Sequence, residues 1–387
     1  MLEELFGTGG VLEAIWGWPP PVLDPAGPYA ERVVVLAWVL IAIGVIVTGI
    51  VILALWVAVR GPEKWRQRLG GEKAVWIMGI AFPGLVLTGL LVWGLTLTAS
   101  LSAPITGNEQ RIRVVGEMWW FRVQYLGTDG EVILEDANEL HLPVGRPVVL
   151  ELTSADVIHN FWVPRLSGKK DMIPGRATFL RVLAGEEGRY GGVCAEYCGG
   201  PHALMGFVAV THEPAQYARW LQARVASGGR AAAPPALQQA AITLPAQAGP
   251  AQAGSQGGPQ TGPAQAGAAQ AGQARGGLAQ SGAGFQPLPA GDLPGDPVAG
   301  RALFMASGCG ACHRVAGTEA NGLVGPDLTH VGGRLTLGAG ILPNHRGTLI
   351  GWIGDSQSIK PGNRMPSYDR LSAQQLHSIA AWLEQQR

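Results

Sequence analysis

The sequence predicts a multidomain membrane protein, in which a two-helix transmembrane hairpin is followed by an all-β sandwich and a small all-α domain. Three observations predict this order: two long apolar runs near the N-terminus, a series of short β-type runs after them, and helical patterns near the C-terminus. The 387 residues suffice for several domains. With zero formal net charge and 14% charged residues, the chain lacks the basic surface that nucleic-acid binding needs, so no nucleic-acid partner is expected.

The two apolar runs, 33–59 and 74–99, each exceed the ~20 residues that a helix needs to cross a bilayer. Buried core helices of a soluble protein, the alternative, are rarely so long without a charge. Lysines and arginines concentrate between the runs, whereas residues 1–31 carry none. The positive-inside rule therefore places the connecting loop in the cytoplasm. The external N-terminal segment 1–32 and everything after the second run are expected on the periplasmic face of a bacterial cell membrane.

Residues 105–225 are expected to form the β domain. Short alternating or β-branched runs separated by turn residues are typical of a small antiparallel sandwich. These runs are 111–115, 121–125, 132–134, 147–153, 177–183 and 207–211.

A dense set of soft metal ligands, CAEYCGGPHALM at 194–205, lies between two of the last runs. Thiolate and thioether ligands favour copper, and imidazole suits it. The two thiolates can bridge two copper ions, with His159 and His202 as terminal ligands. Met205 and a backbone carbonyl near Glu196 can then be weak axial ligands. A disulfide between the two cysteines and a structural zinc site are the alternatives, and the zinc site leaves Met205 unexplained.

Together with Asp156–Pro164 and Gly168–Gly175, this metal loop resembles subunit II of haem–copper cytochrome c oxidases, and the two apolar runs match the same family. The resemblance covers residues from about 30 to 220. It implies a cupredoxin fold and a binuclear copper A centre with the ligands His159, Cys194, Glu196 (through its carbonyl), Cys198, His202 and Met205. It also implies that Glu196 helps to bind magnesium at the interface with the catalytic subunit.

Residues 116–121, GEMWWF, resemble the aromatic motif of this family, in which a Trp passes electrons into copper A. Trp119 is the matching position. The motif departs from the family pattern at Glu117 and Met118, and Phe121 replaces a common Trp. An ordinary core aromatic is the alternative interpretation of Trp119.

Residues 226–290 are expected to form a flexible linker of Ala, Gln, Gly and Pro, in which the sequence PAQAG recurs. Few large apolar side chains are present, so the segment cannot bury enough surface to offset the entropy of ordering. Its expected role is to raise the effective concentration of the C-terminal domain at the β domain.

The C-terminal domain, 291–387, contains CGACH at 309–313, the c-type haem attachment signature. Cys309 and Cys312 are expected to hold the porphyrin through thioethers, with His313 as an axial ligand. Met365 is the expected second axial ligand, because Met opposite His raises the haem potential. The alternatives are a thioredoxin-like redox site for the motif and, for the axial position, Met305, His330 and His345.

Helical patterns at 297–307 and 372–385, the latter with Ser372 as N-cap, flank this motif. Together with Gly325-Pro326-Asp327-Leu328, they resemble small class I cytochromes c, in which the Pro of this loop lies behind the proximal His. This resemblance covers about 292 to 387.

In combination, the motifs resemble subunit II of a caa-type oxidase. The resemblance implies a non-catalytic subunit that accepts electrons at haem c, passes them to copper A and delivers them to an oxygen-reducing, proton-pumping subunit I. The implied partners are subunits I and III, membrane lipid and an external donor such as a soluble cytochrome c or a respiratory complex. A copper A subunit of a nitric oxide reductase and a membrane-anchored copper or redox carrier are the alternatives.

Overall fold

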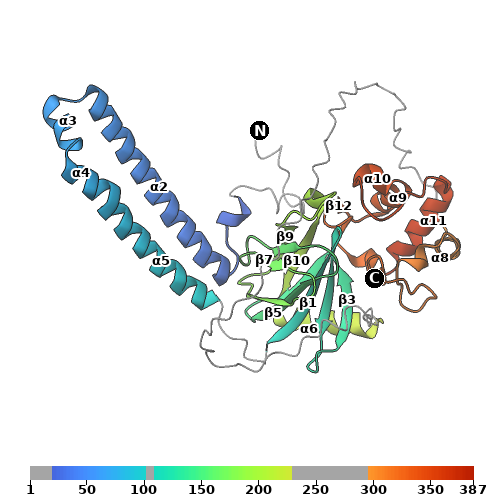
Figure 1. Cartoon of the computed structure of the whole chain (residues 1–387). Coiled ribbons are helices and arrows are strands. Elements are labelled where there is room, and N and C mark those ends of the chain that lie inside the picture. Colours follow the sequence, from blue (N-terminus) through green and yellow to red (C-terminus); the bar gives the residue numbers. More distant parts are fainter. Residues whose placement is uncertain (1–19, 102–108, 229–294) are drawn as a thin grey trace, which may run out of the picture. The chain divides into compact units, whose positions relative to one another are not determined.

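The computed structural model describes residues 20–101, 109–228 and 295–387, coloured in Figure 1. The membrane hairpin, the β domain and the C-terminal helices belong to one compact unit. Most of the expected N-terminal segment and nearly all of the expected linker, 226–290, lie outside the described residues.

Two long helices form the hairpin that the apolar runs predict (Figure 1). The helical elements are η1 (Pro21–Leu23), α2 (Pro28–Arg60), α3 (Glu63–Leu69), α4 (Glu72–Trp76), the π-helical η2 (Ile77–Ala81) and α5 (Phe82–Leu101). The spans Pro28–Arg60 and Glu72–Leu101 are long and apolar enough to cross a membrane, with mean hydropathies of 2.9 and 2.2. Arg32 Nη1 donates to Ser100 Oγ at 3.1 Å, so the start of α2 lies beside the end of α5.

The β domain consists of two five-stranded sheets. The first has the order β3-β2-β1-β5-β8 and comprises β1 (Gln110–Glu117), β2 (Trp120–Leu126), β3 (Val132–Ala137), β5 (Val148–Ser154) and β8 (Thr178–Val182). The second has the order β4-β10-β9-β6-β7 and comprises β4 (Glu139–Pro143), β6 (His159–Trp162), β7 (Lys170–Met172), β9 (Gly188–Cys194) and β10 (Gly206–His212). The predicted runs correspond to β1, β2, β3, β5, β8 and β10.

The predicted sandwich is confirmed, but its sheets are mixed, so the prediction of antiparallel pairing is wrong for two strand pairs. Strand β1 pairs in parallel with β5, and β10 pairs in parallel with β4. Parallel neighbours need a crossover connection, and the chain between β1 and β5, which contains β2, β3 and β4, supplies one.

Aromatic side chains from both sheets fill the core of the sandwich. The ring of Phe207 on β10 lies 4.9 Å from that of Phe121 on β2 and 4.7 Å from that of Phe161 on β6, measured between centroids. A side chain at Gly192 on β9 would place its Cβ 2.2 Å from the Phe207 ring, so a glycine is required there. This packing fixes the ends of β6, β9 and β10, from which the predicted metal ligands extend.

Helix α6 (Pro214–Ala226) follows β10 and closes the β domain. Its Trp220 ring stacks on His141 of β4 at 4.0 Å and lies 5.3 Å from Tyr125 of β2. Buried Tyr217 lies on the same helix. The helix therefore covers one end of the β domain with an aromatic cluster.

The C-terminal domain is helical, as expected. Its elements are α8 (Pro297–Ala306), η4 (Cys309–Ala311), η5 (Val331–Gly333), β11 (Thr336–Leu337), β12 (Leu342–Pro343), α9 (Arg346–Gly354), α10 (Ser356–Ile359) and α11 (Ala373–Glu384). Ser372 accepts a hydrogen bond from the backbone N–H of Gln375, which confirms the predicted N-cap of α11. Phe304 packs on Trp382 with ring centroids 4.9 Å apart, which joins α8 to α11.

Candidate metal centres

The predicted metal loop connects two neighbouring antiparallel strands. Cys194 ends β9, Gly206 begins β10, and the Cys194 N–H donates to the Met205 carbonyl at 2.9 Å, which closes the loop at its base. Gly199 and Gly200 turn the chain with φ values of +85° and +32°, a region that favours glycine. This turn returns the chain toward Cys194 and brings the second half of the loop beside the first.

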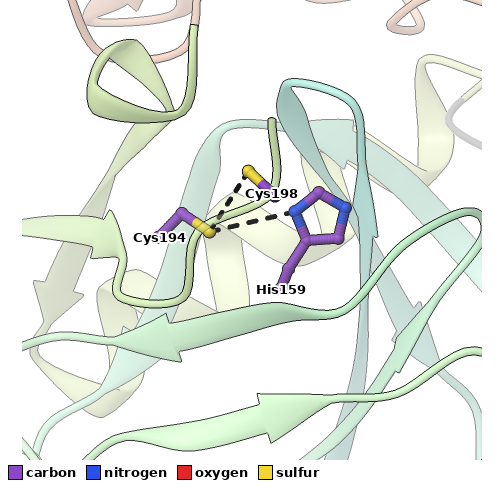
Figure 2. Close-up of side chains that lie close together, drawn as sticks. All are labelled: His159, Cys194 and Cys198. Carbon is purple, nitrogen blue, oxygen red and sulfur yellow. Dashed lines mark hydrogen bonds between the residues drawn. The ribbon is translucent and has the colours of Figure 1, made fainter. Parts of the chain in front are cut away.

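Two cysteine sulfurs lie at the centre of the site (Figure 2). Their Sγ atoms, on Cys194 and Cys198, are 3.8 Å apart, whereas a disulfide has a bond of about 2.05 Å. Both residues are buried free cysteines. The disulfide alternative is therefore not what the structure contains.

Each sulfur has its own pair of neighbours. Cys194 Sγ lies 3.8 Å from His159 Nδ1 and 3.3 Å from the Glu196 carbonyl oxygen. Cys198 Sγ lies 3.4 Å from His202 Nδ1 and 3.8 Å from the Met205 thioether. The structure thus brings all the predicted copper ligands together, with one imidazole and one weaker donor beside each sulfur.

The electrostatics of the site favour a thiolate. A hydrogen bond with Cys198 lowers the pKa of the Cys194 thiol; burial opposes this shift, and a hydrogen bond with His159 adds to it. Burial opposes the protonation of His159, but hydrogen bonds with Asp156 and Cys194 raise its pKa to about 9. The contact with Cys194 and burial raise the pKa of Cys198. One sulfur is therefore a ready ligand, and the second becomes one when a metal displaces its proton.

The donor set fits copper better than zinc. His159, Cys194 and Cys198 form a cluster of ligand atoms within 4.8 Å of one another. A structural zinc site needs only Cys and His, whereas Met205 is 2% exposed with its thioether against Cys198. Thioether and thiolate donors together favour copper.

Trp119 contacts the metal loop directly. Its indole Nε1 donates to the Cys198 carbonyl oxygen at 3.2 Å. A Cβ at Gly200 would lie 2.4 Å from the Trp119 ring, so the indole packs closely on the loop backbone. Trp119 is partly buried and packs against the β-domain core, so it contacts both the core and the metal loop.

The haem motif residues meet at one cavity. Cys309, Cys312, His313 and Met365 all line it, together with apolar side chains such as Phe304. His313 Nδ1 donates to the Pro326 carbonyl oxygen at 2.8 Å, which leaves Nε2 as the free ligand atom. Burial lowers the pKa of His313, so the imidazole is neutral and able to ligate a metal.

Met365 is held by its backbone beside this cavity. Its N–H donates to Asn363 Oδ1 at 2.7 Å, and its carbonyl accepts from Ser356 Oγ and Gln357 Nε2. The three rival candidates are absent from the cavity lining. Among them, Met305 packs on the core, His330 is buried elsewhere, and His345 caps α9.

The cavity is also lined by Met118, Trp119 and Trp120 of the β domain. Lys360 Nζ donates to the carbonyl oxygens of Trp119 at 2.8 Å and Gly338 at 3.0 Å. Trp119 therefore contacts the metal loop through its indole and faces the haem-type cavity as well.

The sequence motifs predict no role for Asp156, although it begins the segment that contains His159. In the structure its carboxylate contacts the imidazole of His159 at 2.8 Å. The sequence shows an aspartate three residues before this histidine. That spacing brings the two side chains into contact only if the chain turns between them, which the sequence does not reveal.

Comparison with known proteins agrees with this geometry. A family profile described as the periplasmic domain of cytochrome c oxidase subunit II matches residues 112–211, and one described as cytochrome c matches 297–387. The chain is 28% identical over 372 residues to cytochrome c oxidase subunit 2 of Alkalihalophilus pseudofirmus, covering 93% of this chain and 89% of that protein. The chain belongs to the subunit II family of cytochrome c oxidases.

Other relatives of this oxidase subunit match a smaller share of the chain. Cytochrome c oxidase subunit 2 of Oenothera berteroana is 28% identical over 245 residues, which cover 57% of this chain and 95% of that protein. The solved periplasmic domain of subunit II of cytochrome oxidase from Bradyrhizobium japonicum is 30% identical, with a TM-score of 0.26, and covers 30% of this chain and 92% of that one.

Membership of this family has two consequences for the subunit. The two apolar helices anchor it to a membrane. The family implies copper A in the β domain and haem c in the C-terminal domain, and the donor sets described above fit both groups.

Proposed function

We propose that this oxidase subunit accepts electrons at a covalently bound haem c, passes them to a binuclear copper A centre and delivers them to a separate subunit I. Subunit I reduces oxygen and pumps protons, and this chain contributes no catalytic residue to that chemistry. One observation carries the proposal: the two cysteine sulfurs lie 3.8 Å apart, and each has one imidazole and one weaker donor beside it.

In this proposal, the Cys194 and Cys198 thiolates and the His159 and His202 imidazoles would hold the two copper ions. The Glu196 carbonyl and the Met205 thioether would be weaker donors. When bound, such a centre shares one electron between two copper ions and so limits the change in geometry on reduction. The chain contributes a closed loop whose sulfurs are buried, which excludes water from the site.

The haem assignment rests on the motif residues that share one cavity. Cys309 and Cys312 would hold the haem through thioethers, and His313 and Met365 would ligate its iron. The hydrogen bond from His313 Nδ1 to Pro326 supports this role, because it orients the imidazole and raises its basicity.

Trp119 is proposed as the connection between the two centres. Its indole binds the carbonyl oxygen of Cys198, and its side chain lines the cavity that contains Met365 and His313. Of the residues that line that cavity, Trp119 is the one with a hydrogen bond to a copper ligand residue.

We further propose that the β and C-terminal domains and both termini lie on the periplasmic face, with α3 and α4 in the cytoplasm. Arg66 and Arg68 lie in the last turn of α3, as the positive-inside rule requires of a cytoplasmic loop. Proposed partners are subunits I and III, membrane lipid, and a soluble cytochrome c or respiratory complex as donor. The exposed Glu196 side chain is available for a magnesium site at the subunit I interface.

Electron paramagnetic resonance of the copper-loaded full-length chain, combined with metal analysis, tests the copper A proposal. The expected result is two coppers per chain with the hyperfine pattern of one electron shared equally between them. A pattern from a single copper would contradict it. Oxygen consumption by the purified complex, compared with nitric oxide consumption, separates a terminal oxidase from a nitric oxide reductase.

A further inference from the structure

Asp156 lies in the turn between β5 and β6, three residues before His159. One carboxylate oxygen, Oδ1, lies 2.8 Å from His159 Nε2, and the other, Oδ2, accepts a hydrogen bond from the Met118 backbone N–H at 2.8 Å. Oδ1 also accepts from the Val157 N–H at 2.7 Å. A single carboxylate therefore binds a copper ligand and the backbone immediately before Trp119.

The imidazole of His159 is confined on two sides. Its Nδ1 faces Cys194 Sγ, and its Nε2 donates a hydrogen bond to the carboxylate of Asp156. A Cβ at Gly116 would lie 2.7 Å from the ring, so the backbone of β1 packs directly against it. A carboxylate on the outer nitrogen of a metal-binding histidine fixes the ring orientation and raises the basicity of the ligating nitrogen.

The carboxylate itself is held by the turn around it. Ser154 Oγ accepts from the Asp156 N–H at 3.1 Å and donates to the Val157 carbonyl at 2.5 Å. The Asp156 side chain is only 16% exposed. Because these hydrogen bonds hold the turn, the carboxylate has little freedom to leave His159 and Met118. Arg364 Nη2 lies 3.8 Å from Oδ2 as a further ion-pair partner.

The second bond of the carboxylate reaches the other half of the metal loop. Met118 precedes Trp119, whose indole donates to the carbonyl oxygen of Cys198. Asp156 is thereby connected to the Cys194 side of the site through His159 and to the Cys198 side through the segment Met118–Trp119.

We propose that Asp156 is a positioning residue that fixes the His159 imidazole and the Met118–Trp119 segment in one arrangement around the copper site. This inference rests on the proposed copper A function. It assigns Asp156 no ligand role, because its carboxylate contacts the nitrogen of His159 that faces away from the sulfurs.

Asp156→Asn tests the proposal in the full-length chain. An amide has the same size, but only one of its two terminal atoms accepts a hydrogen bond, so either His159 or Met118 loses its partner. The expected results are an altered copper hyperfine pattern, a higher reduction potential of the copper centre because a negative charge is lost, and copper affinity about 10–100-fold lower in competition with a chelator.

Asp171→Asn is the matched control. Asp171 Oδ1 accepts from Asn160 Nδ2 at 2.7 Å, beside His159 on β6, and contacts none of the proposed copper ligands. This variant should keep the wild-type spectrum, potential and copper affinity. If Asp156→Asn also keeps all three, the proposal is overturned.

Asp156→Glu covers the case in which Asp156→Asn does not fold. It keeps the charge but moves the carboxylate by one methylene, so the proposal predicts a changed hyperfine pattern with copper retained. An unchanged pattern in folded Asp156→Glu would also overturn it. The wild-type chain distinguishes failure of this inference from failure of the proposed copper A function. If the wild type lacks the hyperfine pattern of a shared electron, the copper A function is contradicted. If the wild type shows that pattern and the Asp156 variants do not change it, only the role of Asp156 is contradicted.

Discussion

The indole N–H of Trp119 donates to the backbone carbonyl oxygen of Cys198 at 3.2 Å. Trp119 comes from the connection between β1 and β2 in one sheet, whereas Cys198 belongs to the loop between β9 and β10 in the other. The bond thus joins the two sheets at the metal loop. It also places an aromatic ring directly on the backbone of a residue that we propose as a copper ligand.

Trp119→Phe keeps an aromatic ring beside Gly200 but removes the donor to Cys198. We expect slower electron transfer from haem c to copper A at unchanged copper content, because the hydrogen bond from the indole to the Cys198 carbonyl oxygen is lost. The lost hydrogen bond should cost about 1 kcal/mol of stability. Photoreduction of the haem in the full-length chain, followed by the copper absorbance, measures the rate.

Trp220→Phe is the control for this experiment. Trp220 is a partly buried tryptophan that packs on the same β-domain core, but it lies on α6 against His141, away from the metal loop. Equal transfer rates in the two variants and the wild type would contradict a role for Trp119 in electron transfer.

Met365→Ala should remove the second axial ligand of the haem iron. The weak absorption band at the red end of the visible spectrum, which reports Met ligation in the oxidised protein, should disappear, and the haem potential should fall because Met raises it. Met305→Leu is the control, since Met305 packs on the core of the same domain and does not line the cavity. A band that persists in Met365→Ala would rule out this residue as the ligand.

The ligand chemistry of both sites could be predicted from the sequence, because soft donors at short spacings limit the metals that can bind. The contact between Asp156 and His159 could not be predicted, since it depends on the turn that Ser154 stabilises. Strand β9 was missed because Gly191 and Gly192 are unusual in strands. The structure explains Gly192, because the ring of Phe207, from the neighbouring strand, occupies the space of a side chain there.

The parallel pairing of β1 with β5 could not be predicted from the sequence either. The pattern of apolar residues along a strand indicates which of its faces is buried, but not which other strand pairs with it. Helix α6 was missed for a related reason: Trp220 gains its partners His141 and Tyr125 only when the sheets have formed.

Phe207→Ala should destabilise the β domain by about 3–5 kcal/mol, because it leaves a cavity between the two sheets. Phe207 is 1% exposed and contacts the rings of Phe121 and Phe161. Since Phe207 lies two residues after Met205, copper should be lost at a lower denaturant concentration as well. Denaturant unfolding, monitored through the copper absorbance, measures both effects. Phe207→Leu should lose less stability than Phe207→Ala. Equal midpoints for Ala and wild type would contradict this packing.

His212 should make the stability of the β domain depend on pH. Burial, followed by the nearby charge of His141, lowers the pKa of His212 from 6.5 to about 4. Its Nε2 lies 2.8 Å from His141 Nδ1, and its ring stacks near Trp220. Between pH 6.5 and 4 the unfolded chain therefore binds more protons at this residue than the folded chain does.

The free energy of unfolding should consequently fall as the pH is lowered through this window, and the contribution of His212 should be constant above and below it. Denaturant midpoints measured across the window in wild type and His212→Gln test this, because the Gln variant keeps a hydrogen-bonding side chain without the titration. Between pH 6.5 and 4, the denaturant midpoint of the variant should change less with pH than that of the wild type. Above neutral pH, the two midpoints should change with pH in the same way. Parallel profiles throughout the window would show that His212 protonates equally well in the folded chain, and would thus contradict its burial beside His141.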